Sequence, residues 1–159
     1  MRKKIVFVFV LALSLSPSIF AQIKPAWIDS VETTLKQNGT LKLETKSERN
    51  ARDYFEYNFE LKSDKFITNV QIQILKDDSN VEKRFAETVE NLTNGMGRFS
   101  TRTRINDLGE EAYKWVNVNK DGWTMIRFRK KAVFVEIFSL SEKLAKSFAE
   151  DVSEQVPGN

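Results

Sequence analysis

The chain has 159 residues, of which 25 are basic and 22 acidic, and it contains neither cysteine nor histidine. The absence of cysteine excludes disulfides, thiol nucleophiles and N-terminal lipidation on cysteine. The absence of histidine removes the usual general base and the commonest ligand of zinc, copper and iron sites. Ser-His and Cys-His catalysis are therefore excluded, and we expect no catalytic residue, no metal site and no cofactor.

The N-terminus has the pattern of a cleavable export signal. Basic residues 2–4 precede an apolar run at residues 5–15, and Ala21 supplies the small residue of a cleavage site. The apolar run is shorter than the ~20 residues that cross a bilayer. We expect residues 1–21 to be removed, which leaves a cysteine-free protein that is periplasmic or secreted and has no membrane anchor.

Removal of the signal changes the charge of the protein. Three of the 25 basic residues lie within residues 1–21 and none of the 22 acidic ones do, so residues 22–159 carry 22 charges of each sign. A neutral domain lacks the long-range attraction that brings proteins to nucleic acids or anionic membranes. We expect no nucleic-acid partner, and the partner predicted instead is an envelope or secreted protein, with the oligomeric state left open.

Residues 22–159 predict a single domain that begins with a helix followed by strands. The helix has apolar residues at helical spacing and ends at Asn38-Gly39, a typical C-cap. Residues 54–61 and 69–74 each alternate between apolar and polar side chains, as half-buried strands do. Residues 40–48 are expected to add an edge strand.

Two further helices and four strands are predicted for the remainder of the chain. The second helix opens with the capping-box sequence Ser79-Asn80-Val81-Glu82, and the third with Ser139-Leu140-Ser141-Glu142. The strands are expected at residues 98–105, 112–118, 123–129 and 132–138. The predicted fold is α+β: an antiparallel sheet of about five to seven strands with three helices, arranged as an α/β/α sandwich.

The hairpin signal Asp121-Gly122 determines on which face of the sheet two aromatic residues are expected to lie. A loop of two or of four residues gives the same parity of pairing, which places Tyr113 and Trp115 on the core face of the sheet. The same face is expected to hold Ile126 and Phe128. Trp123 is then the aromatic residue left to stack on a sugar ring or anchor a partner.

The opposite face of these strands carries both apolar and charged side chains. Either a helix covers this face, or the face is an exposed site for a ligand or partner. The row of Arg98, Arg102 and Arg104 on a neighbouring strand suits a carboxylate, a sulfated sugar or an acidic segment, although an ordinary polar sheet face has the same pattern. The candidate ligand-binding or partner-binding residues are Trp123, Met125, Arg127, Arg129, Phe134, Arg102 and Arg104.

The carboxylates of Asp107, Glu110 and Glu111 cluster in a turn and form a second group of candidate functional residues. Two carboxylates can act as the acid and base of a glycosidase, and carboxylates also suit a hard cation. A solvated turn explains the same residues, because the spacing of a calcium loop is absent. The leading hypothesis is a non-enzymatic exported binding or accessory module of unknown ligand; the alternatives are a small His-free carboxylate hydrolase and a structural subunit of an envelope complex.

The sequence Asp107-Leu108-Gly109-Glu110-Glu111-Ala112-Tyr113 leads into a strand, a hairpin, a last strand and a closing helix. This pattern, over roughly residues 81–155, resembles small exported domains related to the Mog1/PsbP-like fold, including mycobacterial lipoproteins of the LpqN type. The resemblance implies an α/β/α sandwich around an antiparallel sheet, acting as a binding or accessory module. The chain departs from the lipoprotein members because it lacks their lipidated cysteine.

Overall fold

The computed structural model describes residues 24–37, 39–96, 100–117 and 122–158. Within these ranges the chain forms an α+β fold of three helices and seven strands, in agreement with the predicted fold class. No helix in this part of the chain has the length and apolar character needed to span a membrane. The elements in chain order are α1 (Ala26–Gln37), β1 (Lys42–Asn50), β2 (Tyr54–Lys62), β3 (Ile67–Leu75), α2 (Val81–Met96), β4 (Ser100–Ile105), β5 (Glu111–Asn117), β6 (Thr124–Lys130), β7 (Val133–Ser139) and α3 (Glu142–Gln155).

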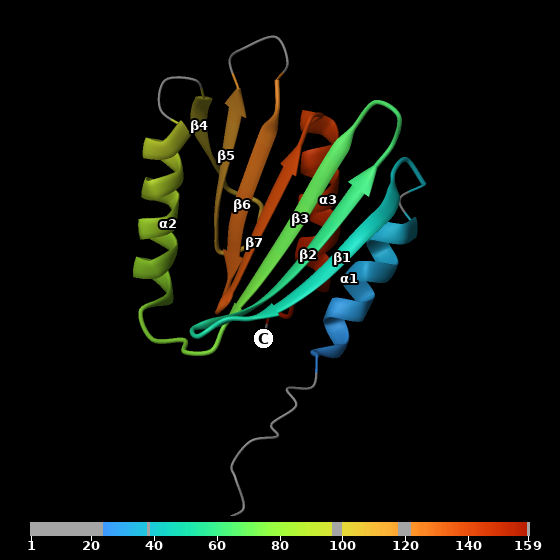
Figure 1. Cartoon of the computed structure of the whole chain (residues 1–159). Helices are drawn as coiled ribbons and strands as arrows, with labels where there is room; N and C mark the ends of the chain where they lie inside the picture. The colour runs from blue at the N-terminus through green and yellow to red at the C-terminus, as the bar shows by residue number, and fades with distance from the viewer. Residues whose placement is uncertain (1–23, 38, 97–99, 118–121, 159) are drawn as a thin grey trace, which may run out of the picture.

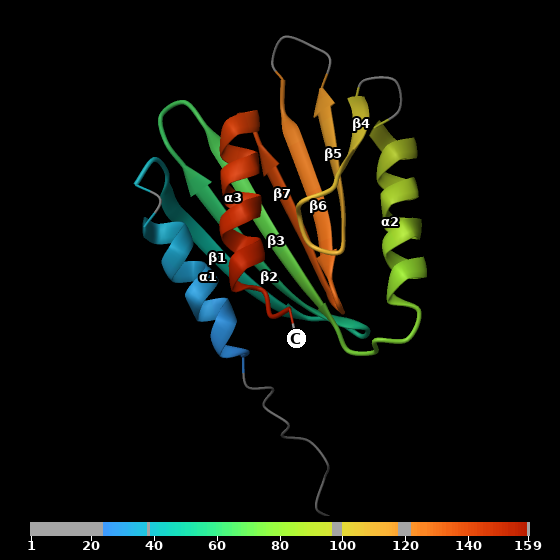
Figure 2. The same cartoon turned by 180° about the vertical axis from the view of Figure 1, so that it is seen from behind.

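All strands join one antiparallel sheet in the order β1-β2-β3-β7-β6-β5-β4 (Figure 1). The helices α1 and α3 pack against each other on one face, with α3 against β6 and β7 (Figure 2). The helix α2 lies on the other face, at the end of the sheet that holds β4 and β5. The cover is therefore offset, and no described helix lies over the α2 side of β1, β2 and β3.

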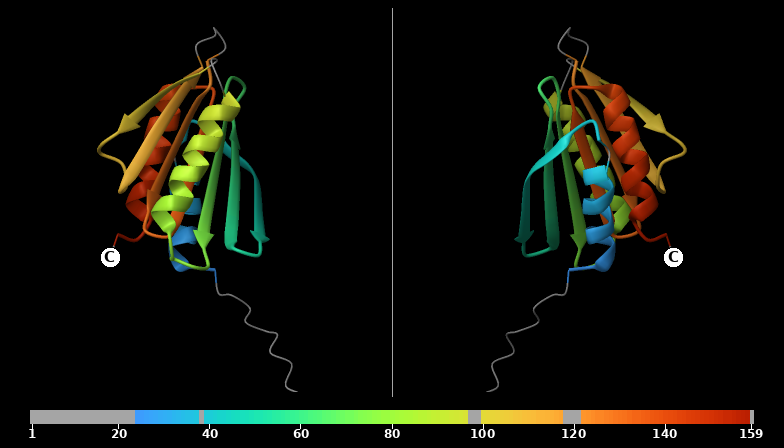
Figure 3. Two further views of the ribbon diagram at one scale, coloured as in Figure 1. Left: turned by 90° about the vertical axis from the view of Figure 1, so that its left-hand side faces the viewer. Right: turned by 90° about the vertical axis from the view of Figure 1, so that its right-hand side faces the viewer.

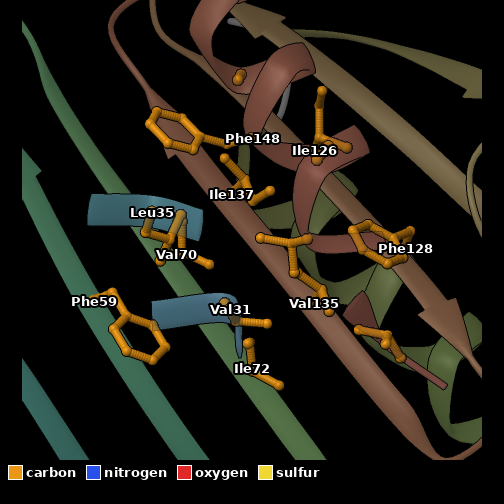
Figure 4. Close-up of a cluster of buried hydrophobic side chains, with 14 of the residues drawn as sticks. Val31, Leu35, Phe59, Val70, Ile72, Ile126, Phe128, Val135, Ile137 and Phe148 are labelled. Atoms are coloured by element: carbon orange, nitrogen blue, oxygen red, sulfur yellow. The ribbon is translucent and has the colours of Figure 1, made fainter. Parts of the chain in front are cut away.

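The main core lies between the sheet and the pair α1 and α3 (Figure 4). Alternate residues of each strand face this core because successive side chains of a strand point to opposite sides. Phe59 and Ile72 contribute from β2 and β3, and Phe148 from α3. The alternation predicted for residues 54–61 and 69–74 is confirmed.

A second, smaller core lies between the sheet and α2. Phe85 is fully buried there, with its ring centroid 5.2 Å from that of Phe134 at an interplanar angle of 66°. Trp115 is also fully buried, and its indole N–H donates a hydrogen bond to Thr93 Oγ1 over 3.3 Å. The predicted cover of this strand face by a helix is thus present, but over only one end of the sheet.

The prediction that Trp115 and Tyr113 share a face with Ile126 and Phe128 is wrong. In the sheet, Tyr113 pairs with Arg127 and Trp115 with Met125. The Asn117 N–H donates to the Trp123 carbonyl over 3.0 Å, so the connection between them is residues 118–122, an odd number. An odd loop reverses the parity that a loop of two or four residues would give. Of the expected Asp121-Gly122 turn, residue 121 lies outside the described residues.

Neither α2 nor α3 has the first serine of its predicted capping box as the N-cap, because that serine makes other hydrogen bonds. At the start of α2, the Ser79 hydroxyl donates to Asp77 over 2.7 Å, and the Asn80 carbonyl accepts the first helical N–H. At the start of α3, Ser141 is the N-cap, while Ser139 is buried and hydrogen-bonded to Thr68 over 2.8 Å. Each helix therefore begins close to its expected residue, but with a different cap.

Candidate functional site

A hollow of about 380 Å³ lies on the uncovered face of the sheet. The sheet twists so that β1 and β2 lie to the same side as α2, while β4 lies to the side of α3 (Figure 3). The volume of the hollow is within the range of about 300–1,000 Å³ of ligand pockets. The lining includes Ser47, Asn58, Asn69, Gln71, Glu136 and Phe138.

Ser47, Asn58, Gln71 and Glu136 of the hollow belong to one transverse row of the sheet, and its other polar residues, Thr45, Glu60 and Asn69, belong to the next row. Cross-strand partners lie on the same face, so a residue and its successive partners form a line across the strands. The row consists of Ser47, Asn58, Gln71, Glu136, Arg127, Tyr113 and Arg104, one residue from each of the seven strands. The strand pairing alone thus places hydroxyl, amide, carboxylate and guanidinium groups side by side.

Hydrogen bonds fix the amides of this row. The Gln71 side-chain amide donates to Asn58 Oδ1 over 3.1 Å, and the Asn58 amide donates to Glu56 over 3.0 Å. Glu56 also accepts from the Gln73 amide over 3.0 Å. Glu56 is buried, so its carboxylate is held in place. Through these two hydrogen bonds it orients the amides of Asn58 and Gln73.

Arg127 closes the network on the other side of the hollow. Its Nη1 donates to Glu136 Oε2 over 2.7 Å, and its Nη2 lies 3.5 Å from Gln73 Oε1. The residue is only 5% exposed, and its guanidinium carbon lies 5.8 Å from the centroid of the Phe134 ring. Burial lowers the pKa of Arg127 below its ordinary value, and the pairing with Glu136 opposes that shift. The sequence-predicted Arg127 is therefore a support beneath the hollow, not a free surface cation.

An apolar rim stands beside the polar row. The rings of Trp123 and Phe138 lie 5.8 Å apart at an interplanar angle of 32°. Met125 is the strand partner of Phe138, and both residues line the hollow. Trp123 and Met125, two of the residues proposed from the sequence, are partly buried here and remain accessible.

The structure places two other predicted site residues away from the hollow. Phe134 is buried against Phe85 beneath α2. Arg129 is buried within a group of carboxylates: its guanidinium hydrogen-bonds Glu110, lies 3.2 Å from Glu82 and donates to Glu111 over 3.3 Å. Both residues stabilise the α2 end of the sheet.

The arginines of β4 are separated from Arg127 by the intervening strand β5. Arg102 is exposed, and its guanidinium lies 5.4 Å from the Tyr113 ring centroid and donates to Thr93 over 3.3 Å. Arg104 is exposed at the edge of the sheet. Residue 98, the other arginine of the row predicted along this strand, lies outside the described residues. The structure therefore does not gather the seven predicted residues into one site.

The acidic turn, which carries Asp107, Glu110 and Glu111, has a structural role. Glu110 and Glu111 both engage Arg129, and the Glu110 N–H donates to the Arg129 carbonyl over 2.9 Å. Asp107 is exposed. Among the described residues no group of three or more Asp or Glu side chains is arranged to hold a metal ion.

The polar residues of the hollow have little distinguishing signal in the sequence. Asn58, Gln71 and Glu136 each occupy the outward position of an alternating strand, which predicts an ordinary solvated face. The one signal that distinguishes them is chemical: β3 carries amides, Asn69, Gln71 and Gln73, where a solvated strand usually carries charges.

Compared with known proteins, the sequence matches no family model and no curated protein sequence.

Proposed function

We propose that the protein is an exported, non-enzymatic binding or accessory module whose ligand lies in the hollow on the uncovered sheet face. The observation that carries the proposal is the row of mutually fixed polar groups beside an apolar rim. Ligand sites combine a few oriented polar groups with apolar surface in this way. The N-terminal signal pattern supports a location outside the cytoplasm.

The network favours binding because its side chains are ordered before a ligand arrives. Immobilising a flexible side chain on binding costs about 0.5–1.5 kcal/mol. The amides of Asn58 and Gln71 are already held by hydrogen bonds to neighbours. Gln71 uses one N–H in this network, which leaves its carbonyl oxygen and second N–H for a ligand.

The same geometry disfavours the hydrolase alternative. Two glycosidase carboxylates must flank the scissile bond with access to substrate. Of the candidate pair Asp107 and Glu111, Asp107 is exposed, whereas Glu111 pairs with the buried Arg129, which also binds Glu110. This arrangement supports a structural role for the acidic turn and leaves binding as the proposed activity.

The proposal is tested by mapping where small molecules bind to the processed protein recovered after export. Titration of a diverse library of small polar compounds is followed by NMR, using the backbone amides and the side-chain amides of Asn58 and Gln71. We expect binding compounds to shift these side-chain signals, and Gln71→Ala to weaken binding at least tenfold. Asn91→Ala, which removes an exposed amide on α2, is the matched control and should bind as the wild type does. Compounds that bind only at other surfaces, or a library without any binder, would contradict the proposal.

A further inference from the structure

The charged groups that line the hollow are already neutralised. Glu136 pairs with Arg127 over 2.7 Å, and Glu60 pairs with Lys62 over 2.7 Å. An anionic ligand would meet these two carboxylates, and a cationic ligand would have to compete with the two side chains that already hold them. Because a desolvated charge needs an opposite partner, the hollow disfavours a ligand of either sign.

The groups that remain available include both donors and acceptors. Asn58, Asn69 and Gln71 carry amides, which donate through N–H and accept through C=O, and Ser47 and Thr45 carry hydroxyls. The backbone groups of the central strands are paired with neighbouring strands, so the face offers side chains only. A ligand that lies flat here must itself present groups that both donate and accept, and a set of hydroxyls does so.

The apolar rim adds a second requirement. Phe138 lies in the row next to the amide row and forms a tilted aromatic pair with Trp123, which lies one row farther away. Adjacent rows on one sheet face are roughly 7 Å apart, since a strand rises ~3.4 Å per residue. A flat ring with C–H groups on one side can contact the electron-rich face of Trp123, while hydroxyls of a ring farther along the same ligand reach Asn58 and Gln71.

We infer that the ligand of the hollow is a neutral saccharide of at least two rings. One sugar ring lies against Trp123 and Phe138, and the hydroxyls of a ring farther along the chain of sugars bind the amides of Asn58 and Gln71. Glu56 accepts from the Asn58 amide, and Arg127 contacts Glu136 and Gln73; both are buried beside the hollow and support the row without contacting the ligand. This inference rests on the proposed binding function and narrows its ligand to one chemical class.

The experiment is an array of neutral, anionic and cationic oligosaccharides, followed by NMR titration of each binder against the processed protein. A neutral oligosaccharide is expected to shift the Trp123 indole N–H together with the side-chain amides of Asn58 and Gln71. Trp123→Ala and Gln71→Ala should each weaken binding at least tenfold, whereas Trp123→Phe, which keeps a ring, should retain most of it. Asn91→Ala should bind normally, and thermal unfolding of every variant confirms that it is folded.

The outcomes separate the inference from the proposed function. If the hollow binds only charged oligosaccharides, or only library compounds without hydroxyl groups, the saccharide inference is wrong and the binding function stands. If neutral saccharides bind but leave the signals of Asn58 and Gln71 unchanged, the inference is also wrong. If neither the array nor the library of small polar compounds yields a ligand for this face, both are wrong.

Discussion

Gly109 is the residue at which the acidic turn meets β6. Its φ of +61° lies in the left-handed region, where residues with a Cβ are strained. A Cβ at this position would lie 2.5 Å from the Arg129 carbonyl oxygen and 3.2 Å from the Phe128 ring. The same carbonyl accepts the Glu110 N–H, so the close approach of the turn to β6 depends on the missing side chain.

We therefore predict that Gly109→Ala lowers the free energy of unfolding by about 2 kcal/mol or more, because it combines backbone strain with a steric clash. Gly95→Ala is the control, since nothing lies within 4 Å of a Cβ there and the residue is in α2. It should be neutral or stabilising by up to about 1 kcal/mol, from its higher helix propensity. Urea unfolding of both variants measures the difference. Equal stabilities would show that the turn does not require glycine.

Single residues also show how far the sequence determines the site. Alternation correctly assigned Phe59 and Ile72 to the core, because a strand has only two sides. The facing of Trp115 could not be derived in the same way, since it depends on whether a loop has an odd or even number of residues. The amides of Asn58 and Gln71 were visible as outward positions, but only the pairing of β2 with β3 brings them together.

At the scale of elements, Glu32 links α1 to β1. Its carboxylate lies 2.7 Å from Lys36 Nζ on the same helix and 2.8 Å from Lys46 Nζ on β1. Hydrogen bonds from Lys36 and Lys46 lower the pKa of Glu32 from 4.5 to about 2. The carboxylate therefore stays ionised in the folded protein over a pH range in which it is protonated in the unfolded chain.

This shift predicts a pH-dependent contribution to stability. A carboxyl whose pKa is depressed by folding stabilises the folded state above its unfolded pKa, and this stabilisation is lost as the pH falls from about 4.5 to 2. We expect Glu32→Gln to lower the free energy of unfolding by about 1 kcal/mol at pH 6, the range of exposed ion-pair networks, and by little at pH 2. Thermal unfolding at both pH values tests this.

The control for Glu32 is Glu87→Gln on α2. Glu87 is well exposed and lies 3.9 Å from Lys83, its partner one helical turn away. Such a pair contributes at most about 0.5 kcal/mol, so this variant should unfold nearly as the wild type does at both pH values. A stability difference for Glu32→Gln that persisted at pH 2 would show that its effect is not electrostatic.

At the scale of the whole molecule, the offset of the helices decides which surface is open. The periodicity of the sequence predicted three helices and an antiparallel sheet. It could not predict that α2 lies toward the β4 and β5 end of the sheet, because this depends on the strand order and on the twist of the assembled sheet. The hollow exists only because of this offset, so the site belongs to the tertiary structure and not to any local motif.

The two cores on opposite faces also predict two levels of local stability. Phe85 is the fully buried residue of α2 in the smaller core, whereas α3 packs into the larger one through Phe148. We predict that Phe85→Ala costs about 3–5 kcal/mol and that its main effect is to release α2 by local unfolding. Amide hydrogen exchange followed by NMR should show much faster exchange along α2 and a smaller change along α3. Equal acceleration in both helices would contradict this and show that the two cores unfold as one unit.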